Sequence, residues 1–247
     1  MEESTTDHGG QRQSPSAPDA GPAPVAHPGL AEALLDPEGG AGAELRGHVP
    51  DDPRGVVLIL HGGAEDSRMP VRWWSLAALR MLPFATAISR RAGHDLAVVR
   101  LKYRVRGWNG IRQDPVQDAR WALERIRRVL PGLPIALIGH SMGGRVALHL
   151  ANQPDVAAIA ALAPWIVGDV TSPRPGTRML LMHGTRDRMT DPRRTQVIAE
   201  RYTLEGADVT HVPVDGETHA MLHHPGRWHD DVATFVTDAL AGSDPLQ

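Results

Sequence analysis

Short apolar runs alternate with helical segments along most of this 247-residue chain, and this alternation restricts the fold more than any other feature. The apolar runs are four to eight residues long and are bounded by turn residues, which is typical of buried strands. We place these strands at residues 56–60, 96–103, 135–138, 156–163, 179–183 and 209–214. The helical segments lie at residues 71–91, 114–129, 144–152, 192–204 and 228–240. Strands that alternate with helices predict an α/β fold, in which a mostly parallel sheet carries helices on both faces.

Local signals refine the ends of these elements. Residues 45–49 predict an antiparallel edge strand ahead of the parallel ones. Pro83 falls inside the 71–91 helix and predicts a kink, because proline lacks the backbone N–H that a helix interior needs. Pro115 lies in the first turn of the 114–129 helix, where that loss costs nothing. Asp191 precedes the 192–204 helix, and we interpret it as a helix cap.

The chain divides into one domain and two ends. Residues 1–28 are rich in Ser, Pro, Gly, Ala and Gln and show no hydrophobic period. Such a segment buries too little apolar surface to offset its ordering entropy, so we predict a disordered tail, with a docking segment as the alternative. Residues 29–242 are long enough for a single domain with a sizeable core. Residues 243–247 read as a frayed C-terminus.

Composition excludes several classes of function. A net charge of −3 gives no electrostatic reason to expect nucleic acid or an anionic membrane as a partner. The chain has no cysteine, which excludes disulfides, thiolate catalysis and cysteine-ligated zinc, and which fits a cytoplasmic protein. Its apolar runs are too short to span a bilayer, and its N-terminus lacks the pattern of a secretory signal. We therefore expect a cytoplasmic protein that acts on a small molecule.

The stretch Gly-His-Ser-Met-Gly-Gly at residues 139–144 lies between a predicted strand and a predicted helix. This is the context of a nucleophile elbow, where a serine occupies a strained turn and its hydroxyl projects from the sheet edge. Gly139 and Gly143 lack the Cβ atoms that would clash in so tight a turn. Ser141 is therefore the candidate nucleophile, and the N–H of Met142 is a candidate donor to an oxyanion. An ordinary strand-to-helix turn with an incidental serine is the alternative.

An acid and a base follow in the order that a serine nucleophile requires. Asp187 comes after the strand at 179–183, and His219 comes after the strand at 209–214. The carboxyl ends of parallel strands meet at one edge of the sheet, so we expect both side chains near Ser141. His219 would accept the proton of the serine, and Asp187 would orient the imidazole.

Other side chains compete for these roles. Asp169, which follows the preceding strand, is the alternative acid. The alternative histidines are His211, which lies inside a strand, together with His223, His224 and His229. His219 and His223 have the i, i+4 spacing of a metal pair, but Ser141 and Asp187 already account for His219, so we expect no metal.

A second glycine-rich turn, His61-Gly62-Gly63, follows the strand at 56–60. Small residues there would let the backbone approach a substrate carbonyl, which makes the N–H of Gly63 the candidate second oxyanion donor, with Ala64 as the alternative. A phosphate cradle is disfavoured, because the turn lacks the Gly-Lys-Ser/Thr of a P-loop.

The four motifs "HGG", "GHSMGG", "HGTRD" and "GETH" occur in the order found in the α/β-hydrolase family, and the chain resembles that family over residues 45–240. The resemblance implies an eight-stranded, mostly parallel sheet and a serine-hydrolase triad of Ser141, Asp187 and His219. It also supports Asp187 over Asp169, because "GTRD" matches the family pattern. Only about a dozen Pro/Gly-rich residues occupy the place where many members carry a large cap. We therefore predict an open site without a cap, although the 71–91 helix could overhang it.

Several loop side chains are candidates for the substrate pocket. Trp108, Trp165, Met189 and Met221 lie at the same sheet edge and could line an apolar acyl pocket, with core packing as the alternative. Arg104 and Arg106 are interpreted as a solvated loop face, with binding of a substrate carboxylate as the alternative.

Together these residues predict a serine hydrolase that cleaves a carboxylic ester or thioester through an acyl-enzyme and needs no cofactor. A peptidase or a dienelactone-hydrolase-like enzyme on the same fold is the enzymatic alternative. A hydrolase-fold binding protein without turnover is the non-enzymatic one.

Overall fold

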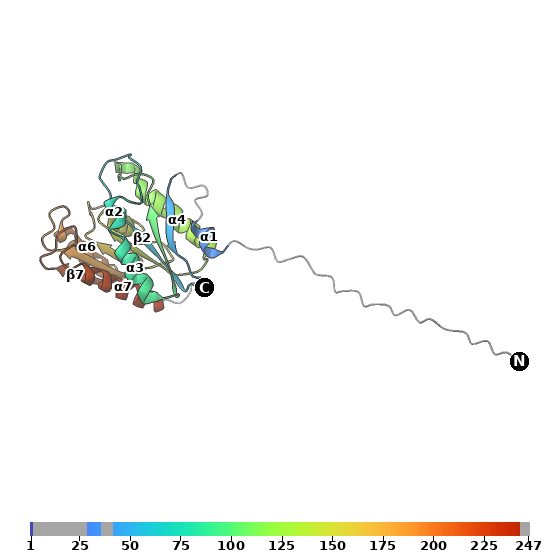
Figure 1. Ribbon diagram of the computed structural model, residues 1–247. Coiled ribbons are helices and arrows are strands. Elements are labelled where there is room, and N and C mark those ends of the chain that lie inside the picture. Colours follow the sequence, from blue (N-terminus) through green and yellow to red (C-terminus); the bar gives the residue numbers. More distant parts are fainter. Residues whose placement is uncertain (2–28, 36–41, 243–247) are drawn as a thin grey trace.

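The computed structural model describes residues 1, 29–35 and 42–242, which fold around one seven-stranded sheet (Figure 1). The strands are β1 (Glu44–His48), β2 (Gly55–Leu60), β3 (Leu96–Lys102), β4 (Ile135–His140), β5 (Val156–Leu162), β6 (Arg178–Gly184) and β7 (Asp208–Val214). Their order across the sheet is β1-β3-β2-β4-β5-β6-β7, with β1 antiparallel to β3 and every other pair parallel. The α/β fold, the mostly parallel sheet and the antiparallel edge strand are thereby confirmed.

The expected strand count was wrong, because the described residues form seven strands rather than eight. Among the described residues only β1 precedes the parallel strands, and it pairs along its whole length with β3. The chain then turns at once into β2, since the N–H of Arg54 already donates to the carbonyl of Asp95 at 2.7 Å. The link between β1 and β2, residues 49–54, forms no strand.

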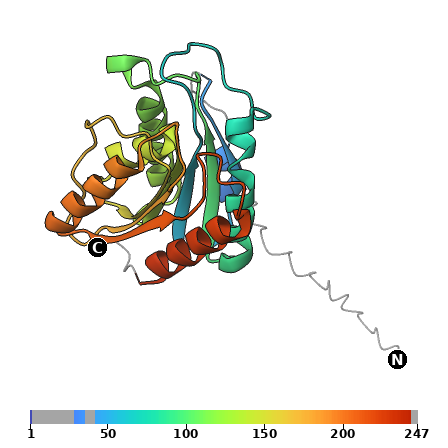
Figure 2. The same cartoon turned by 90° about the vertical axis from the view of Figure 1, so that its left-hand side faces the viewer.

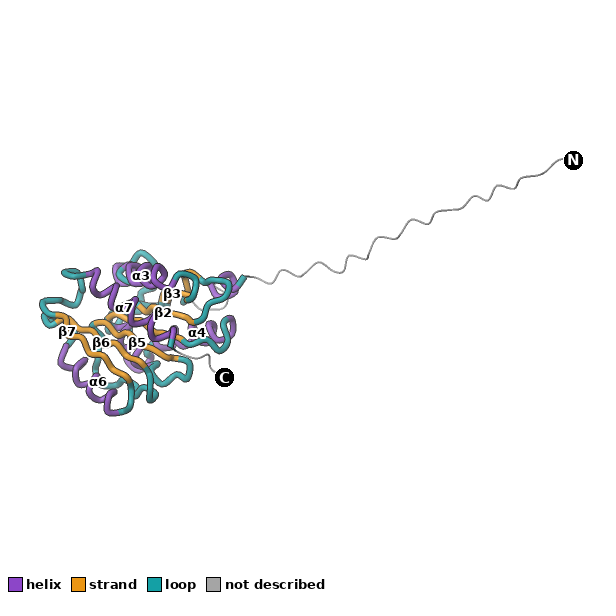
Figure 3. Tube along the Cα trace, turned by 90° about the horizontal axis from the view of Figure 1, so that it is seen from below, coloured by secondary structure: helices purple, strands orange, loops and turns teal. Residues whose placement is uncertain are grey.

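Helices cover both faces of the sheet (Figures 2 and 3). They are α1 (Leu30–Leu35), α2 (Leu76–Leu79), α3 (Leu82–Ala92), α4 (Asp114–Val129), α5 (Met142–His149), α6 (Pro192–Leu204) and α7 (Pro225–Ala241), with a short 3₁₀ helix, η1 (Gly110–Arg112). The helices α3 and α7 pack against each other on one face, where they share a core cluster. The helices α1, α4, α5 and α6 contribute to the core of the other face. No described helix is both long and apolar enough to cross a bilayer.

The central strand β2 shows why this sheet is buried on both sides. All six of its residues are buried. Val56, Leu58 and Leu60 belong to the core cluster on the α4–α5 side, whereas Val57 and Ile59 belong to the cluster beneath α3 and α7. Successive strand side chains point to opposite faces, so a continuous apolar run is what two covered faces require.

The predicted helix at 71–91 is instead two separate helices, α2 and α3, preceded by an extended segment. Pro70 forms an antiparallel bridge with Val105, and the N–H of Val71 donates to the carbonyl of Arg104. These long-range bonds hold the first residues in an extended form. Pro83 then lies in the first turn of α3, where proline starts a helix rather than kinking one.

The link between β5 and β6 contains no helix or strand among its described residues, which confirms the absence of a large cap. Its backbone is held against α6. The guanidinium of Arg194 donates to the carbonyl of Ile166 at 2.9 Å, and the hydroxyl of Tyr202 donates to the carbonyl of Thr171 at 2.8 Å.

The predictions of a disordered tail and of a frayed C-terminus concern residues 2–28 and 243–247, which lie outside the described ones. The short helix α1, which no sequence pattern indicated, begins directly after this tail. Its Leu34 is fully buried in the core. The Arg125 guanidinium on α4 donates to the carbonyls of Ala33 and Leu34, at 2.8 Å each. The helix α1 therefore packs against the core, while the domain boundary near residue 29 stays a prediction.

We expect a chain that begins at Gly29 to melt at the same temperature as the full chain, because the composition of residues 1–28 predicts no packing. A chain that begins at Gly42 should melt about 5 °C lower or more, since it loses the buried Leu34 and two acceptors of Arg125. Thermal melts of the three proteins test this. A lowered melt for the Gly29 chain would show that the tail packs on the domain.

Candidate active site

Ser141 lies in the sharp turn between β4 and α5, with the strained backbone angles φ 57° and ψ −116°. The turn has no room for side chains on its neighbours. A Cβ added at Gly139 would lie 2.1 Å from the carbonyl oxygen of Gly143, and one added at Gly143 would lie 2.3 Å from that of Leu60. The glycines therefore allow β4 to reverse into α5 within one residue, as the nucleophile-elbow pattern predicts.

Substitution of Gly143 by Ala should lower the melting temperature by about 5 °C or more, because the backbone of β2 cannot move away from the added methyl group. The matched control is Gly226→Ala, where an added Cβ meets nothing within 4 Å. Thermal melts of both variants test the expectation. A Gly143→Ala protein that melts with the parent would mean that the turn relaxes without cost.

The loops after β6 and β7 bring Asp187 and His219 into direct contact. His219 Nδ1 lies 2.8 Å from Asp187 Oδ2, although the two residues are 32 positions apart. The Asp187 side chain has no exposed surface, and that of His219 is only 9% exposed. The parallel sheet thus brings the predicted acid and base together at the edge that also carries Ser141.

Further donors surround the Asp187 carboxylate. Its Oδ1 accepts from the N–H groups of Met189 and Thr190, and its Oδ2 accepts from Thr190 Oγ1 at 2.7 Å and from His183 Nε2 at 3.1 Å. Burial by itself raises the pKa of Asp187, but the hydrogen bonds from His183, His219 and Thr190 outweigh burial and hold the pKa well below its usual range. Asp187 is therefore ionised at neutral pH.

An ionised Asp187 decides the tautomer of His219. A carboxylate only accepts hydrogen bonds, so His219 carries its proton on Nδ1 and leaves Nε2 as an acceptor. The main chain of His219 is fixed as well, because Nε2 of His140 donates to its carbonyl at 3.0 Å. His140 directly precedes Ser141, and its ring lies 4.8 Å from the His219 ring. Within the described chain no hydrogen bond joins Ser141 Oγ to His219, which is common in unliganded hydrolases.

The two candidate oxyanion donors lie side by side. A Cβ added at Gly63 would lie 2.3 Å from the carbonyl oxygen of Arg106 and 2.4 Å from the Met142 side chain, and the backbone contact leaves room only for glycine. The N–H of Ala64, the alternative donor, is already bonded to the carbonyl of Arg106 at 2.9 Å. Among the described residues, the N–H groups of Gly63 and Met142 have no acceptor. Both remain available to a ligand.

The four predicted pocket residues occupy different environments. Trp108 is buried and lies against the Arg145 guanidinium at 3.7 Å, and Trp165 contacts the same guanidinium at 4.5 Å. Met221 is buried in the α3–α7 cluster, whereas Met189 is 77% exposed. Their role in substrate binding stays a prediction.

The alternative acid, Asp169, lies in a different network. Its carboxylate pairs with the Arg145 guanidinium, with one contact at 3.2 Å, and lies 3.4 Å from His149 Nε2. None of its recorded contacts is with His219, the partner of Asp187.

The histidines that compete with His219 also have other partners. His223 Nδ1 lies 3.3 Å from Glu217 Oε2, and His224 lies against the other oxygen of the same carboxylate. His219 and His223 thus bind two separate carboxylates rather than forming a pair. Across the described ranges, no three side chains of the metal-binding types converge on one point.

A cavity of about 590 Å³ opens beside the glycine-rich turn after β2. His61, Gly62 and Gly63 form one side of it, and the segment before α2 forms the other. The apolar part of its lining consists of Met69, Pro70, Val71, Trp74, Leu76 and Ala77, and two arginines, Arg72 and Arg106, complete it together with Ser75.

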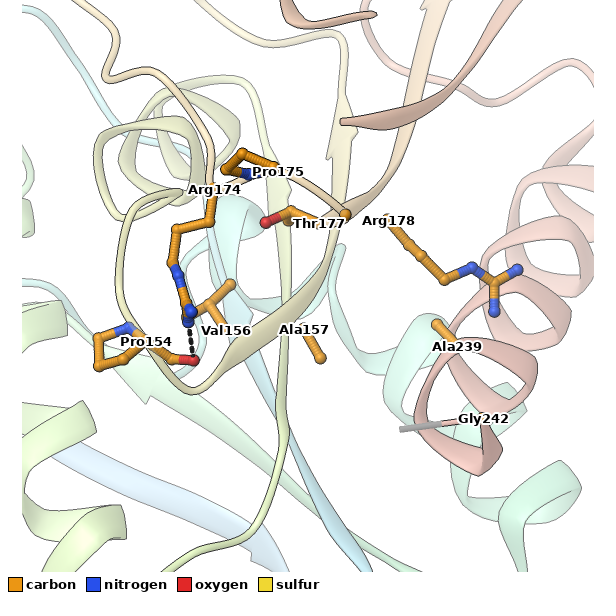
Figure 4. A pocket seen from close by; sticks show the side chains of 10 residues that line it. Pro154, Val156, Ala157, Arg174, Pro175, Thr177, Arg178, Ala239 and Gly242 are labelled. Atoms are coloured by element: carbon orange, nitrogen blue, oxygen red, sulfur yellow. Dashed lines mark hydrogen bonds between the residues drawn. The ribbon is translucent and has the colours of Figure 1, made fainter. Parts of the chain in front are cut away.

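A smaller cavity, of about 280 Å³, lies at the other end of the strands, where β5 and β6 begin (Figure 4). It is formed where β5 and β6 begin and α7 ends, and on one side of it the Arg174 guanidinium donates to the carbonyl of Pro154. Ser141, Asp187 and His219 are all at the carboxyl ends of the strands, so this second cavity is remote from them.

Two buried histidines next to the glycine-rich turns are held neutral. Burial lowers the pKa of His61 to about 4. Burial, and then the nearby His219, lower the pKa of His140 to about 3. His61 Nδ1 donates to the carbonyl of Gly62 at 2.6 Å, which helps to shape the turn before Gly63.

These pKa values predict acid sensitivity. Below about pH 6.5 the unfolded chain binds protons at both histidines while the folded chain does not, so the free energy of unfolding falls as the pH falls. The slope is about 1.4 kcal/mol per pH unit for each histidine, down to about pH 4. Urea unfolding at pH 7, 6 and 5 should show a shallower slope for His61→Gln or His140→Gln. The exposed His94→Gln is the control, and equal slopes in all four proteins would contradict the assignment.

Comparison with known proteins identifies the fold and the family of the chain. The sequence pattern of the family described as serine aminopeptidase, S33, matches residues 51–178. Similar solved structures include a lidless α/β serine hydrolase from Xanthomonas campestris, with 20% identity over 82% of this chain and 90% of that one, at a TM-score of 0.58. Others are esterase 2 from Thermogutta terrifontis, with 18% identity over 81% and 91% at a TM-score of 0.61, and a putative α/β hydrolase from Agrobacterium tumefaciens, with 16% over 83% and 94% at 0.66. No curated protein matches the sequence.

These structural likenesses establish the fold, and the family pattern covers more than half of the 247 residues. With the elbow at Ser141 and the sheet order in place, the chain belongs to the serine aminopeptidase S33 family of the α/β serine hydrolase superfamily.

Proposed function

We propose that the protein hydrolyses carboxylic esters or thioesters through an acyl-enzyme formed on Ser141, with His219 as the general base and Asp187 as the residue that orients it. The observation that carries the proposal is the 2.8 Å contact between His219 Nδ1 and Asp187 Oδ2, at the sheet edge that also bears the strained serine. A strained non-glycine residue, a buried carboxylate and a histidine with a free Nε2 are three requirements of this chemistry.

The proposed reaction has two halves. In the first, His219 Nε2 takes the proton of Ser141 as the hydroxyl oxygen attacks the acyl carbon. The same proton then passes to the leaving alcohol or thiol as its bond to the acyl carbon breaks. In the second, a water molecule gives a proton to His219 and attacks the acyl carbon. That proton then passes to Ser141 Oγ as the bond between Oγ and the acyl carbon breaks and the carboxylic acid leaves. The ionised Asp187 stabilises the imidazolium that forms in both halves.

The negative charge that develops on the carbonyl oxygen needs donors. We assign this role to the N–H groups of Gly63 and Met142, which have no acceptor among the described residues. Met142 is the first residue of α5, where the helix dipole adds a partial positive charge. Removing one such donor in a hydrolase costs about 100- to 1,000-fold in turnover.

The family description also raises aminopeptidase activity, and a peptidase is one of the alternatives from the sequence. An aminopeptidase must bind the ammonium group of its substrate, and a carboxylate near the site usually does so. The cavity beside Gly63 is lined by two arginines and by no Asp or Glu. This lining favours ester substrates over peptides with a free amino terminus.

Two structural neighbours carry ester-related ligands. Esterase 2 from Thermogutta terrifontis has been solved after phosphonylation by cyclosarin and with butyrate bound, and Est1E from Butyrivibrio proteoclasticus has been solved with ferulic acid. These ligands belong to those proteins, and they motivate the choice of probes for this one.

The test is active-site labelling. The protein should react with a fluorophosphonate probe in a 1:1 ratio, with the added mass on the peptide that contains Ser141, and should hydrolyse p-nitrophenyl acetate. No labelling and no turnover, in a protein that melts cooperatively, would instead support a binding protein on the hydrolase fold. Mass on a peptide without Ser141 would assign another nucleophile.

A further inference from the structure

We infer that the enzyme prefers esters that carry a carboxylate or a similar anionic group on an apolar chain, and that Arg72 and Arg106 bind this group in the cavity beside Gly63. The inference rests on the proposed function and specifies the class of its substrate. It starts from the position of the cavity, which shares the Gly62-Gly63 turn with the candidate oxyanion site. A substrate whose carbonyl oxygen lies at Gly63 has this cavity next to it.

The volume and lining of the cavity suit an amphiphilic chain. About 590 Å³ is within the range of small-molecule sites. Met69, Trp74 and Leu76 contribute apolar surface, and all three are more than 60% exposed, so none of them is part of the core. Apolar side chains that face a cavity rather than the core are available to bind an acyl or aryl chain.

The two arginines are the only charged residues of the lining. In the described part of the chain, neither guanidinium forms an ion pair or a hydrogen bond through its side chain. Arg72 is instead placed over the ring of Trp74, at 5.3 Å. Arg104, two residues before Arg106, shows the contrast, because its side chain is paired with Asp118 and lies 3.7 Å from Asp114.

Two guanidinium groups without a carboxylate partner line one cavity, so an anion that enters it meets positive charge from both side chains. A guanidinium binds carboxylate through two parallel hydrogen bonds, which gives geometric selectivity as well as attraction. An apolar wall with two such groups therefore fits an ester of a dicarboxylic acid, or an acylated hydroxy acid, better than a neutral ester of the same length.

Two pairs of esters test the inference and distinguish the side that bears the anion. Mono(p-nitrophenyl) adipate against p-nitrophenyl hexanoate places the carboxylate on the acyl side. The acetate ester of 4-hydroxyphenylacetate against p-tolyl acetate places it on the leaving group. We expect kcat/KM to favour the anionic member about tenfold in at least one pair at low salt, and this ratio to fall in 0.5 M NaCl.

The Arg72→Gln/Arg106→Gln double variant should reduce that ratio to about one, and Arg106→Glu should invert it. Arg68→Gln is the matched control, because this exposed arginine lies in the same segment but outside the lining, and it should leave both rates unchanged. Thermal melts confirm that each variant is folded. A wild-type ratio of one or less in both pairs overturns the inference, as does a ratio that survives the double substitution.

The same experiments distinguish failure of the anion site from failure of the proposed function. Turnover of the neutral esters without any preference overturns the anion site alone. Absence of fluorophosphonate labelling and of turnover in both pairs overturns the proposed function, and the anion site with it.

Discussion

Replacement of Ser141 by Ala is expected to abolish ester hydrolysis and fluorophosphonate labelling while leaving the protein folded. The hydroxyl is the only atom that could attack a substrate from the elbow, and loss of a triad nucleophile costs at least about a thousandfold in turnover. Alanine has the same Cβ as serine, so it fits the backbone at φ 57° no worse than serine does. The measurements are kcat/KM for p-nitrophenyl acetate, in-gel labelling and a thermal melt.

The matched control for this variant is Ser89→Ala. Ser89 lies on α3, and its side chain has no hydrogen bond within the described chain, so both labelling and turnover should match the parent. Retained labelling of the Ser141→Ala protein would contradict the assignment directly. A fall of less than tenfold in kcat/KM would show that turnover does not pass through this hydroxyl.

The fold was largely predictable because local signals and tertiary packing agree over most of the chain. The helices α4 and α6 begin and end where Pro115, Asp191 and the apolar spacing predict. The Asp191 side chain does cap α6, by accepting from the N–H of Arg193 at 3.0 Å. In such segments the sequence preference and the buried face indicate the same element.

The prediction of a single helix over residues 71–91 failed because a long-range contact outweighed the helical preference of the local sequence. The bridge between Pro70 and Val105 joins residues 35 positions apart, and the hydrophobic periodicity of neither segment predicts it. The same bridge holds the segment against the loop that carries Arg106, and so it forms the wall of the cavity. The part of the fold that was hardest to predict is therefore the part that we assign to substrate binding.

The candidate active site was likewise predictable from the sequence only in part. Ser141, Asp187 and His219 stand in motifs whose spacing has a chemical meaning, so they could be identified from the sequence. His183, Thr190 and His140 could not, although two of them lie inside the same motifs. Their contacts depend on how the loops after β6 and β7 pack against each other, and motif spacing does not predict that packing.

His183 illustrates what the structure adds. Its Nε2 donates to Asp187, and its Nδ1 accepts from the hydroxyl of Thr195 at 2.7 Å, with the ring almost fully buried. His183 and His219 therefore both contact Oδ2 of Asp187, and of the two only His219 lies in the loop that touches His140, the residue before Ser141. His183 is a positioning residue for the carboxylate rather than a second base.

The second large effect is expected for Asp187→Asn, which should lower kcat by about ten-thousandfold. Asparagine keeps the size of the side chain, but its amide donates where the carboxylate accepted. His219 would then present Nδ1 as an acceptor and carry its proton on Nε2, so it could not take the proton of Ser141. Steady-state kinetics with p-nitrophenyl acetate give the magnitude. Because a hydroxide ion can replace the missing base, the residual rate should increase with pH above neutrality.

The contrasting variant is Asp169→Asn, which tests the alternative acid. Asp169 is bound to Arg145 and His149, so its loss should affect the melting temperature more than the turnover of the folded protein. A second comparison uses Thr190→Val, which keeps the carboxylate and removes one hydroxyl donor at 2.7 Å, and should cost far less than Asp187→Asn. If Asp169→Asn loses turnover and Asp187→Asn keeps it, the acid lies on the preceding loop. The 2.8 Å contact between Asp187 and His219 would then have only a structural role.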